Sequence, residues 1–186
     1  MSMPKPAPAI QQIGGVMQDF SLPLVSGGPS SLSASLVNKR GGLVVFWSGV
    51  CSHCARYDRY LSSFPERHPE LGLTVVASRQ GETAAQIHRV ITDRRLTFPI
   101  LHDLNGALAA RWLTQYTPKA FLINSDCVLV YRGAIDNFKL PDDPAHLTYL
   151  EAAIEDFLAG RPLRQPETAS FGCAIQSVYY QIPYPL

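Results

Sequence analysis

The chain has 186 residues, of which 46% are hydrophobic and 17% are charged. A chain of this size and composition can bury about 70% of its unfolded surface and needs no disulfide or metal to fold as one domain. Its 16 basic and 15 acidic residues are interspersed and leave a net charge of +1, which argues against nucleic acid or an anionic membrane as a partner. No apolar run approaches the roughly 20 residues that a membrane span requires.

Residues 1–18 are predicted to form a proline-rich tether. Pro4, Pro6 and Pro8 favour an extended chain, of the kind that often follows a removed signal or anchor. Four cysteines in the chain fit either a reducing or an oxidising compartment. We therefore expect a periplasmic or other extracytoplasmic location if a leader has been removed, and a cytoplasmic location otherwise.

Strand and helix patterns alternate from residue 19 onward. Residues 19–24 predict a short strand followed by a turn, and residues 30–38 predict one or two loose helical turns. The apolar, β-branched and aromatic run 43–47 is typical of a buried strand. Cys54, Tyr57, Leu61 and Phe64 then follow at helical spacing.

The same alternation continues through the middle of the chain. Residues 71–77 predict another buried strand, and 81–94 predict an amphipathic helix. A brief extended piece at 98–101 precedes a helical pattern at 105–116.

The last elements are a hairpin and a helix. Residues 120–124 and 128–131 are predicted to pair antiparallel. A helix is predicted with Asp143 as its cap and Pro144 as its first residue, and Gly160 with Pro162 should end it. The series predicts an α/β fold with a mixed central sheet covered by helices on both faces, and residues 163–186 are predicted to be an irregular tail that contains Cys173.

Two cysteines lie where the central strand passes into a helix. The first turn of a helix has unpaired backbone N–H groups, which favour a thiolate over a thiol. Cys51 is therefore placed to act as a nucleophile, and Cys54 follows one helical turn later.

This region resembles a known family. The segment 46–54, Phe-Trp-Ser-Gly-Val-Cys-Ser-His-Cys, resembles the active-site segment of the thioredoxin superfamily, and 116–123 resembles its cis-proline loop and the following strand. The extra N-terminal strand and the segment 130–136 are most similar to the redoxin branch, the TlpA-like and AhpC/TSA-like proteins. The resemblance covers roughly residues 19–160, so we predict a redoxin domain at 19–162 with a thioredoxin-like three-layer fold.

The resemblance implies a thiol-disulfide oxidoreductase. Cys51 would attack a substrate disulfide and Cys54 would resolve the mixed disulfide. The partners would be protein or small-molecule thiols and disulfides, together with a redox partner protein that donates or accepts electrons. No cofactor is expected beyond the redox-active pair itself, and no metal ligands are assigned, because two cysteines at this spacing supply only half of a tetrahedral zinc site.

Other residues of the site follow from the same resemblance. The Thr117–Pro118 bond should be cis, so that the backbone before Pro118 lies opposite the cysteine pair and can bind substrate as an added strand. Trp47, Ser52 and Thr117 are assigned to substrate binding. An imidazolium at His53 would stabilise a Cys51 thiolate and make the pair a better oxidant.

The sequence also departs from the family. Many thioredoxins have a buried acid where this chain has Val45, and several cytochrome c maturation reductases have Glu where it has Tyr57. Asp58 is expected to point elsewhere, so water, His53 or another group must accept the Cys54 proton.

Two alternative functions stay open. A peroxiredoxin-like peroxidase would fit Ser48, which lies three residues before the first cysteine, but Val44 replaces the expected proline. In that case Arg111 or Arg132 could stabilise the thiolate. The second alternative is a non-catalytic module of the same fold that binds a metal or a partner.

Two cysteines lie outside the pair. Cys127 is predicted to be an inert residue at the margin of the sheet. Cys173 could act as a third redox thiol, pair with Cys127, or join His53 and the cysteine pair around a soft metal such as copper, and a passive thiol is an equal alternative.

Overall fold

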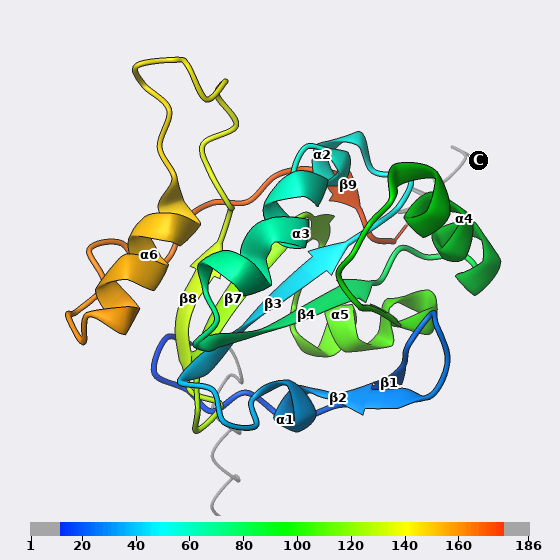
Figure 1. Cartoon of the computed structure of the whole chain (residues 1–186), viewed down its shortest axis with the longest axis horizontal. Coiled ribbons are helices and arrows are strands. Elements are labelled where there is room, and N and C mark those ends of the chain that lie inside the picture. The colour runs from blue at the N-terminus through cyan, green and yellow to red at the C-terminus, as the bar shows by residue number, and fades with distance from the viewer. Residues whose placement is uncertain (1–11, 177–186) are drawn as a thin grey trace, which may run out of the picture.

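The computed structural model describes residues 12–176 of the chain. Its centre is a five-stranded sheet with the order β5-β4-β3-β7-β8 (Figure 1). These strands are β3 (Gly41–Trp47), β4 (Leu71–Ala77), β5 (Ile100–His102), β7 (Lys119–Asn124) and β8 (Leu129–Gly133). Strands β3, β4 and β5 run parallel, whereas β7 is antiparallel to both β3 and β8. The predicted mixed sheet and its closing hairpin are confirmed.

The central strand β3 is buried along its whole length, and its side chains alternate between two cores. Leu43 and Trp47 pack into the first core with helices α3 (Asp58–Arg67), α4 (Ala84–Arg94) and α6 (Tyr149–Leu158). Val44 and Phe46 point to the opposite face of the sheet. The predicted helical layers on both faces are therefore confirmed.

The second core lies under shorter elements. Helices α1 (Leu32–Ser35) and α5 (Ala107–Arg111) cover this face, and a 3₁₀ turn (Leu104–Gly106) leads into α5. Strands β1 (Ser21–Pro23) and β2 (Pro29–Ser31) form a separate hairpin.

Part of the segment predicted as a tether packs against the domain. Val16 bridges to Val128 at the β7–β8 turn, and the Met17 side chain is 1% exposed within the second core. Residues 1–11 lie outside the described residues, so the N-terminal part of the predicted tether is not placed. No helix among residues 12–176 is long and apolar enough to cross a membrane.

Two predicted helix boundaries are wrong. The last helix begins at Tyr149 rather than Asp143, because the Asp143 side chain accepts the Ala145 N–H at 2.8 Å and forms a turn instead of a helix cap. Helix α5 ends at Arg111, and Leu113 has φ 45°, which no α-helix can continue.

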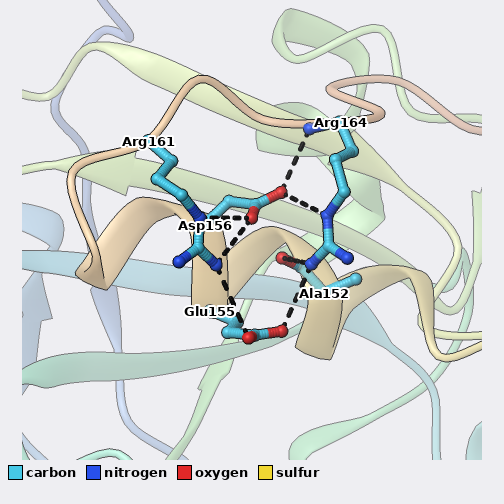
Figure 2. A network of polar contacts seen from close by, with 5 residues as sticks. All are labelled: Ala152, Glu155, Asp156, Arg161 and Arg164. Carbon is cyan, nitrogen blue, oxygen red and sulfur yellow. Dashed lines mark hydrogen bonds and ion pairs between the residues drawn. The ribbon is translucent and has the colours of Figure 1, made fainter.

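The tail after α6 follows a defined path along the domain. Figure 2 shows the Asp156 carboxylate between Arg161 and Arg164. It accepts hydrogen bonds from Arg164 Nε at 2.9 Å and from Arg161 at 3.0 Å, which fix the chain where it leaves the helix. Glu167 bridges to Arg132 on β8 in parallel register. Residues 163–176 of the tail are irregular, as predicted, except for a short strand that the sequence did not indicate. The rest of the predicted tail, residues 177–186, lies outside the described residues.

That strand is β9 (Cys173–Ala174), which pairs antiparallel with β6 (Tyr116–Thr117). Thr117 lies opposite Cys173, and Tyr116 lies opposite Ala174. Because β6 ends at the proline loop, the tail reaches the end of the molecule where helix α2 (Ser52–Ala55) lies (Figure 1).

Candidate functional site

The two cysteines lie at the turn between β3 and the short helix α2 (Ser52–Ala55). Cys51 is the N-cap residue of α2 and Cys54 is in its only turn. Both residues have 0% of their surface exposed. The Cys51 sulfur lies 3.4 Å from the Thr117 backbone oxygen, to which the protonated thiol would donate, so the strand–helix turn and the proline loop meet at the sulfur.

The two thiols have opposite pKa shifts. A hydrogen bond from the Cys54 side chain, helped by Cys173, the Cys54 backbone N–H and Thr117, lowers the pKa of Cys51 to about 4 against the opposing effect of burial. Burial, together with the hydrogen bond to Cys51 and its charge, raises the pKa of Cys54 well above its ordinary value. The two shifts favour a thiolate at Cys51 and a protonated thiol at Cys54.

The proline loop has the predicted geometry. The Thr117–Pro118 peptide bond is cis, which confirms that expectation. Thr117 is 1% exposed, because the tail covers it, and its hydroxyl donates to the Cys173 backbone oxygen at 3.4 Å.

Cys173 is brought to the pair by β9. Its position opposite Thr117 places it against the first core, beside Cys51 and Cys54. Its thiol forms a hydrogen bond with Cys51, and it accepts the His53 backbone N–H. Burial and the neighbouring Cys51 raise the pKa of the Cys173 thiol.

The helix residues between the cysteines have different surroundings. The His53 ring packs beside Phe138 at 4.8 Å and Phe171 at 6.3 Å between ring centroids. Its Nδ1 atom is buried and has no hydrogen-bond partner within residues 12–176. Ser52 is exposed and begins α2, so the N-cap position belongs to Cys51 and not to Ser52.

Trp47 lies beneath the site and not on its surface. Its side chain is fully buried, and its Nε1 donates to Asp58 at 3.2 Å. Asp58 also pairs with Arg94, whose guanidinium donates to the Gly49 backbone oxygen at 2.6 Å. The structure therefore makes Trp47 a support of the 48–50 turn, and its contact with substrate stays a prediction.

Glu82 was not predicted and lies under the same turn. It is 5% exposed and accepts the Gly49 N–H at 2.7 Å, and burial raises the pKa of its carboxyl. A methyl group at Gly49 would lie 2.8 Å from this carboxylate, so glycine allows the close approach. Only the tertiary structure reveals Glu82, because 33 residues separate it from Gly49.

The remaining candidates lie away from the pair. Cys127 packs against the second core rather than the first, and burial raises its pKa. Arg132 on β8 pairs with Glu167 of the tail. Within residues 12–176, no group of three or more His, Cys, Asp or Glu side chains is arranged to hold a metal ion. The metal-binding alternative gains no support from this arrangement.

The comparisons with known proteins agree with this geometry. The AhpC/TSA family matches residues 13–132. The thiol-disulfide oxidoreductase ResA of Oceanobacillus iheyensis is 25% identical over 130 residues, which are 68% of each chain. The ResA of Bacillus thuringiensis is 24% identical over 47% of this chain and 50% of its own length.

Solved structures share the fold over most of the chain. A hypothetical protein of Sinorhizobium meliloti has a TM-score of 0.77 at 25% identity and covers 88% of this chain and 93% of its own. A secreted Mycobacterium tuberculosis disulfide oxidoreductase has a TM-score of 0.54 at 16% identity, with 75% and 95% covered. With the family match over more than half of its residues, the chain belongs to the AhpC/TSA family, in the redoxin branch of the thioredoxin superfamily.

Proposed function

We propose that the protein is a thiol-disulfide oxidoreductase that uses Cys51 as the attacking thiolate and Cys54 as the resolving thiol. The Cys51 sulfur attacks one sulfur of a substrate disulfide, forms a mixed disulfide and releases the other substrate sulfur as a thiolate. Cys54 then loses its proton and attacks Cys51, which releases the second substrate thiol. Two protein thiols are oxidised and one substrate disulfide is reduced, and the reverse sequence oxidises a dithiol.

The observation that carries this proposal is the placement of Cys51 at the start of α2, with Cys54 in the same turn and the Thr117 oxygen 3.4 Å from the Cys51 sulfur, and the two thiols have opposite pKa shifts there. A low pKa makes Cys51 a nucleophile and a good leaving group, whereas a high pKa keeps Cys54 protonated until a mixed disulfide has formed. Both electrons are carried by the pair itself, so the proposal requires no cofactor.

The lowered pKa of Cys51 favours oxidation of a substrate dithiol by the protein. Stabilising the Cys51 thiolate stabilises the reduced protein and raises the reduction potential, by about 30 mV for each 1.4 kcal/mol. We therefore expect a pair that is more oxidising than one with an ordinary thiol. A thiol, disulfide or redox partner protein would be its substrate, and an extracytoplasmic location would suit this direction.

The two alternatives have less support. A peroxidase would use a cationic group beside the thiolate, but the groups that lower the Cys51 pKa are thiol, backbone and hydroxyl donors. A non-catalytic module would not need two thiols with opposed pKa values.

Trapping tests the proposal. The Cys54→Ser/Cys173→Ser double variant leaves Cys51 as the reactive sulfur of the site, and glutathione disulfide should convert it into a stable adduct at Cys51. The matched Cys51→Ser/Cys173→Ser variant should take no adduct at the site. Mass spectrometry of the intact chain and of its peptides gives both results. An unmodified Cys51 after prolonged exposure would contradict the proposal.

A further inference from the structure

The attacking sulfur is covered in this structure. Cys51 has no exposed surface, although an attacking thiol must reach a substrate sulfur. The neighbouring Val50 is 57% exposed, so the turn itself lies at the surface. The tail residues 171–176 lie against the site, and we name them the strap.

The strap is a strand added to the proline loop. It pairs with β6 in antiparallel register, with Cys173 opposite Thr117. Strand addition is a general way for a protein to bind an extended peptide, because the exposed edge supplies backbone hydrogen bonds. The strap therefore occupies the edge on which an extended substrate would have to pair.

The strap is held from both sides. The Ile175 N–H donates to the Gln115 oxygen at 2.9 Å, and the Ile175 oxygen accepts the Gln80 N–H at 2.8 Å. The Ile175 side chain is 2% exposed and lies in the second core. The strap is thus docked by the buried Ile175 side chain, by Phe171 packed beside His53 and Phe138, and by a few backbone hydrogen bonds. A segment held by so few contacts can open locally.

Glycine at position 172 makes the docking possible. A Cβ atom there would lie 1.9 Å from the Thr117 oxygen and 3.4 Å from Pro118 Cδ. Any other residue at this position would push the strap away from the proline loop. The sequence therefore provides one position where the docking can be removed without altering a thiol.

We propose that the strap is a tethered substrate strand, and that it presents Cys173 to Cys51 as a third redox thiol. This inference rests on the exchange chemistry proposed above. Three observations carry it, namely the complete burial of Cys51 beneath the strap, the register of Cys173 opposite Thr117, and the Cys51 contact with the Thr117 oxygen. A protein substrate would have to displace the strap before it could pair with β6.

The exchange balances without an added reagent other than the substrate disulfide. Once Cys51 holds a substrate sulfur in a mixed disulfide, the Cys173 thiolate attacks the Cys51 sulfur and forms the Cys51–Cys173 bond. The substrate leaves as a thiolate and takes up the proton that Cys173 lost. Starting instead from the Cys51–Cys54 disulfide, the same attack releases Cys54 as the thiol, with no net oxidation.

A pair of variants tests the third thiol. Cys54→Ser/Cys127→Ser retains only Cys51 and Cys173, and after exposure to glutathione disulfide it should lose two thiols while carrying no glutathione. The matched Cys54→Ser/Cys127→Ser/Cys173→Ser variant should keep one glutathione on Cys51. Peptide mapping without reduction should find the Cys51–Cys173 disulfide in the first variant.

The outcomes separate this inference from the proposed function. A lasting glutathione adduct on Cys51 in both variants, with Cys173 still open to alkylation, overturns the inference and leaves the exchange function intact. Absence of any adduct or disulfide at Cys51 in both variants overturns the exchange function, and the inference falls with it.

A second test removes the docking without removing a sulfur. In the Cys54→Ser/Cys127→Ser background, Gly172→Ala should speed the alkylation of Cys51 by iodoacetamide by about tenfold or more, since each tenfold corresponds to about 1.4 kcal/mol of lost docking. Ser170→Ala is the matched control and should alkylate at the parent rate. Circular dichroism should show that both variants fold. Equal alkylation rates in the two folded variants would overturn the inference.

Discussion

Replacing Cys54 with alanine should raise the pKa of Cys51, whereas replacing it with serine should not. The largest contribution to the low pKa of Cys51 is the hydrogen bond from the Cys54 side chain. Alanine removes that donor, and serine keeps a hydroxyl donor of similar size in the same position. The comparison therefore isolates the hydrogen bond from the other consequences of losing the second thiol.

The size of the effect follows from the energy of such a bond. A hydrogen bond to a charged group contributes about 1.5–3 kcal/mol, and one pKa unit corresponds to about 1.4 kcal/mol. The Cys51 pKa of about 4 should therefore rise by roughly 1 to 2 units in Cys54→Ala. In Cys54→Ser it should stay within about one unit of the parent value.

The ultraviolet absorbance of the thiolate, followed from acid to neutral pH, measures this pKa. Cys54, Cys127 and Cys173 all have pKa values raised above the ordinary range, so an absorbance step in acid belongs to Cys51. Cys51→Ser is the control and should lack the step. If the alanine and serine variants titrate alike, the Cys54 hydrogen bond is not what stabilises the thiolate.

Four further predictions concern the support of the site. Glu82→Ala should lower the free energy of unfolding in urea by about 1–3 kcal/mol and slow exchange with glutathione, because the buried Gly49 N–H loses its acceptor. Glu82→Gln should keep most of the stability and most of the exchange rate. Equal behaviour of the two variants would contradict this prediction. Asp103→Ala should lower the free energy of unfolding by roughly 3 kcal/mol in the same assay. The reason is that the buried Asp103 carboxylate accepts two backbone N–H groups of α5 and the Ser78 hydroxyl. A loss of stability below the error of the assay would refute that role. Arg164 and Arg161 lower the pKa of Asp156 to about 2. The stability that Asp156 contributes should therefore be complete above about pH 4 and lost as the pH falls toward 2. Asp156→Asn should abolish this acid dependence of stability, and an unchanged pH profile would argue against the role of Asp156. Oxidation of the active-site pair should speed hydrogen exchange of the Ile175 amide, and identical exchange in both redox states would exclude coupling between the thiolate and the strap.

The sequence predicts those parts of the fold whose characteristic pattern lies within a few neighbouring residues. The buried run of β3 and the polar turn between β7 and β8 each carry their pattern within a few residues. The Cys-x-x-Cys spacing at the end of β3 likewise indicates which two sulfurs meet, because one helical turn separates them. These elements are confirmed with boundaries shifted by only a few residues.

The parts that the sequence could not predict depend on long-range contacts. Strand β9 has two residues and no strand pattern of its own, and its order comes from pairing with β6, which lies 56 residues earlier in the chain. Helix α6 shows the opposite case. Its expected start carries a good capping residue, Asp143, but the same carboxylate closes a turn with Ala145, and the helix begins only at Tyr149.

The strap and the thiolate should stabilise each other. Cys173 is one of the groups that lower the Cys51 pKa, so a docked strap favours the ionised sulfur. Coupling of this kind is reciprocal, and an ionised Cys51 must therefore favour the docked strap by the same free energy. Once Cys51 is oxidised with Cys54, it no longer offers a charged acceptor, and the strap keeps its anchor at Ile175, the packing of Phe171 and its backbone hydrogen bonds. We therefore expect the reduced protein to be the closed form and the oxidised protein to open more easily to a substrate strand.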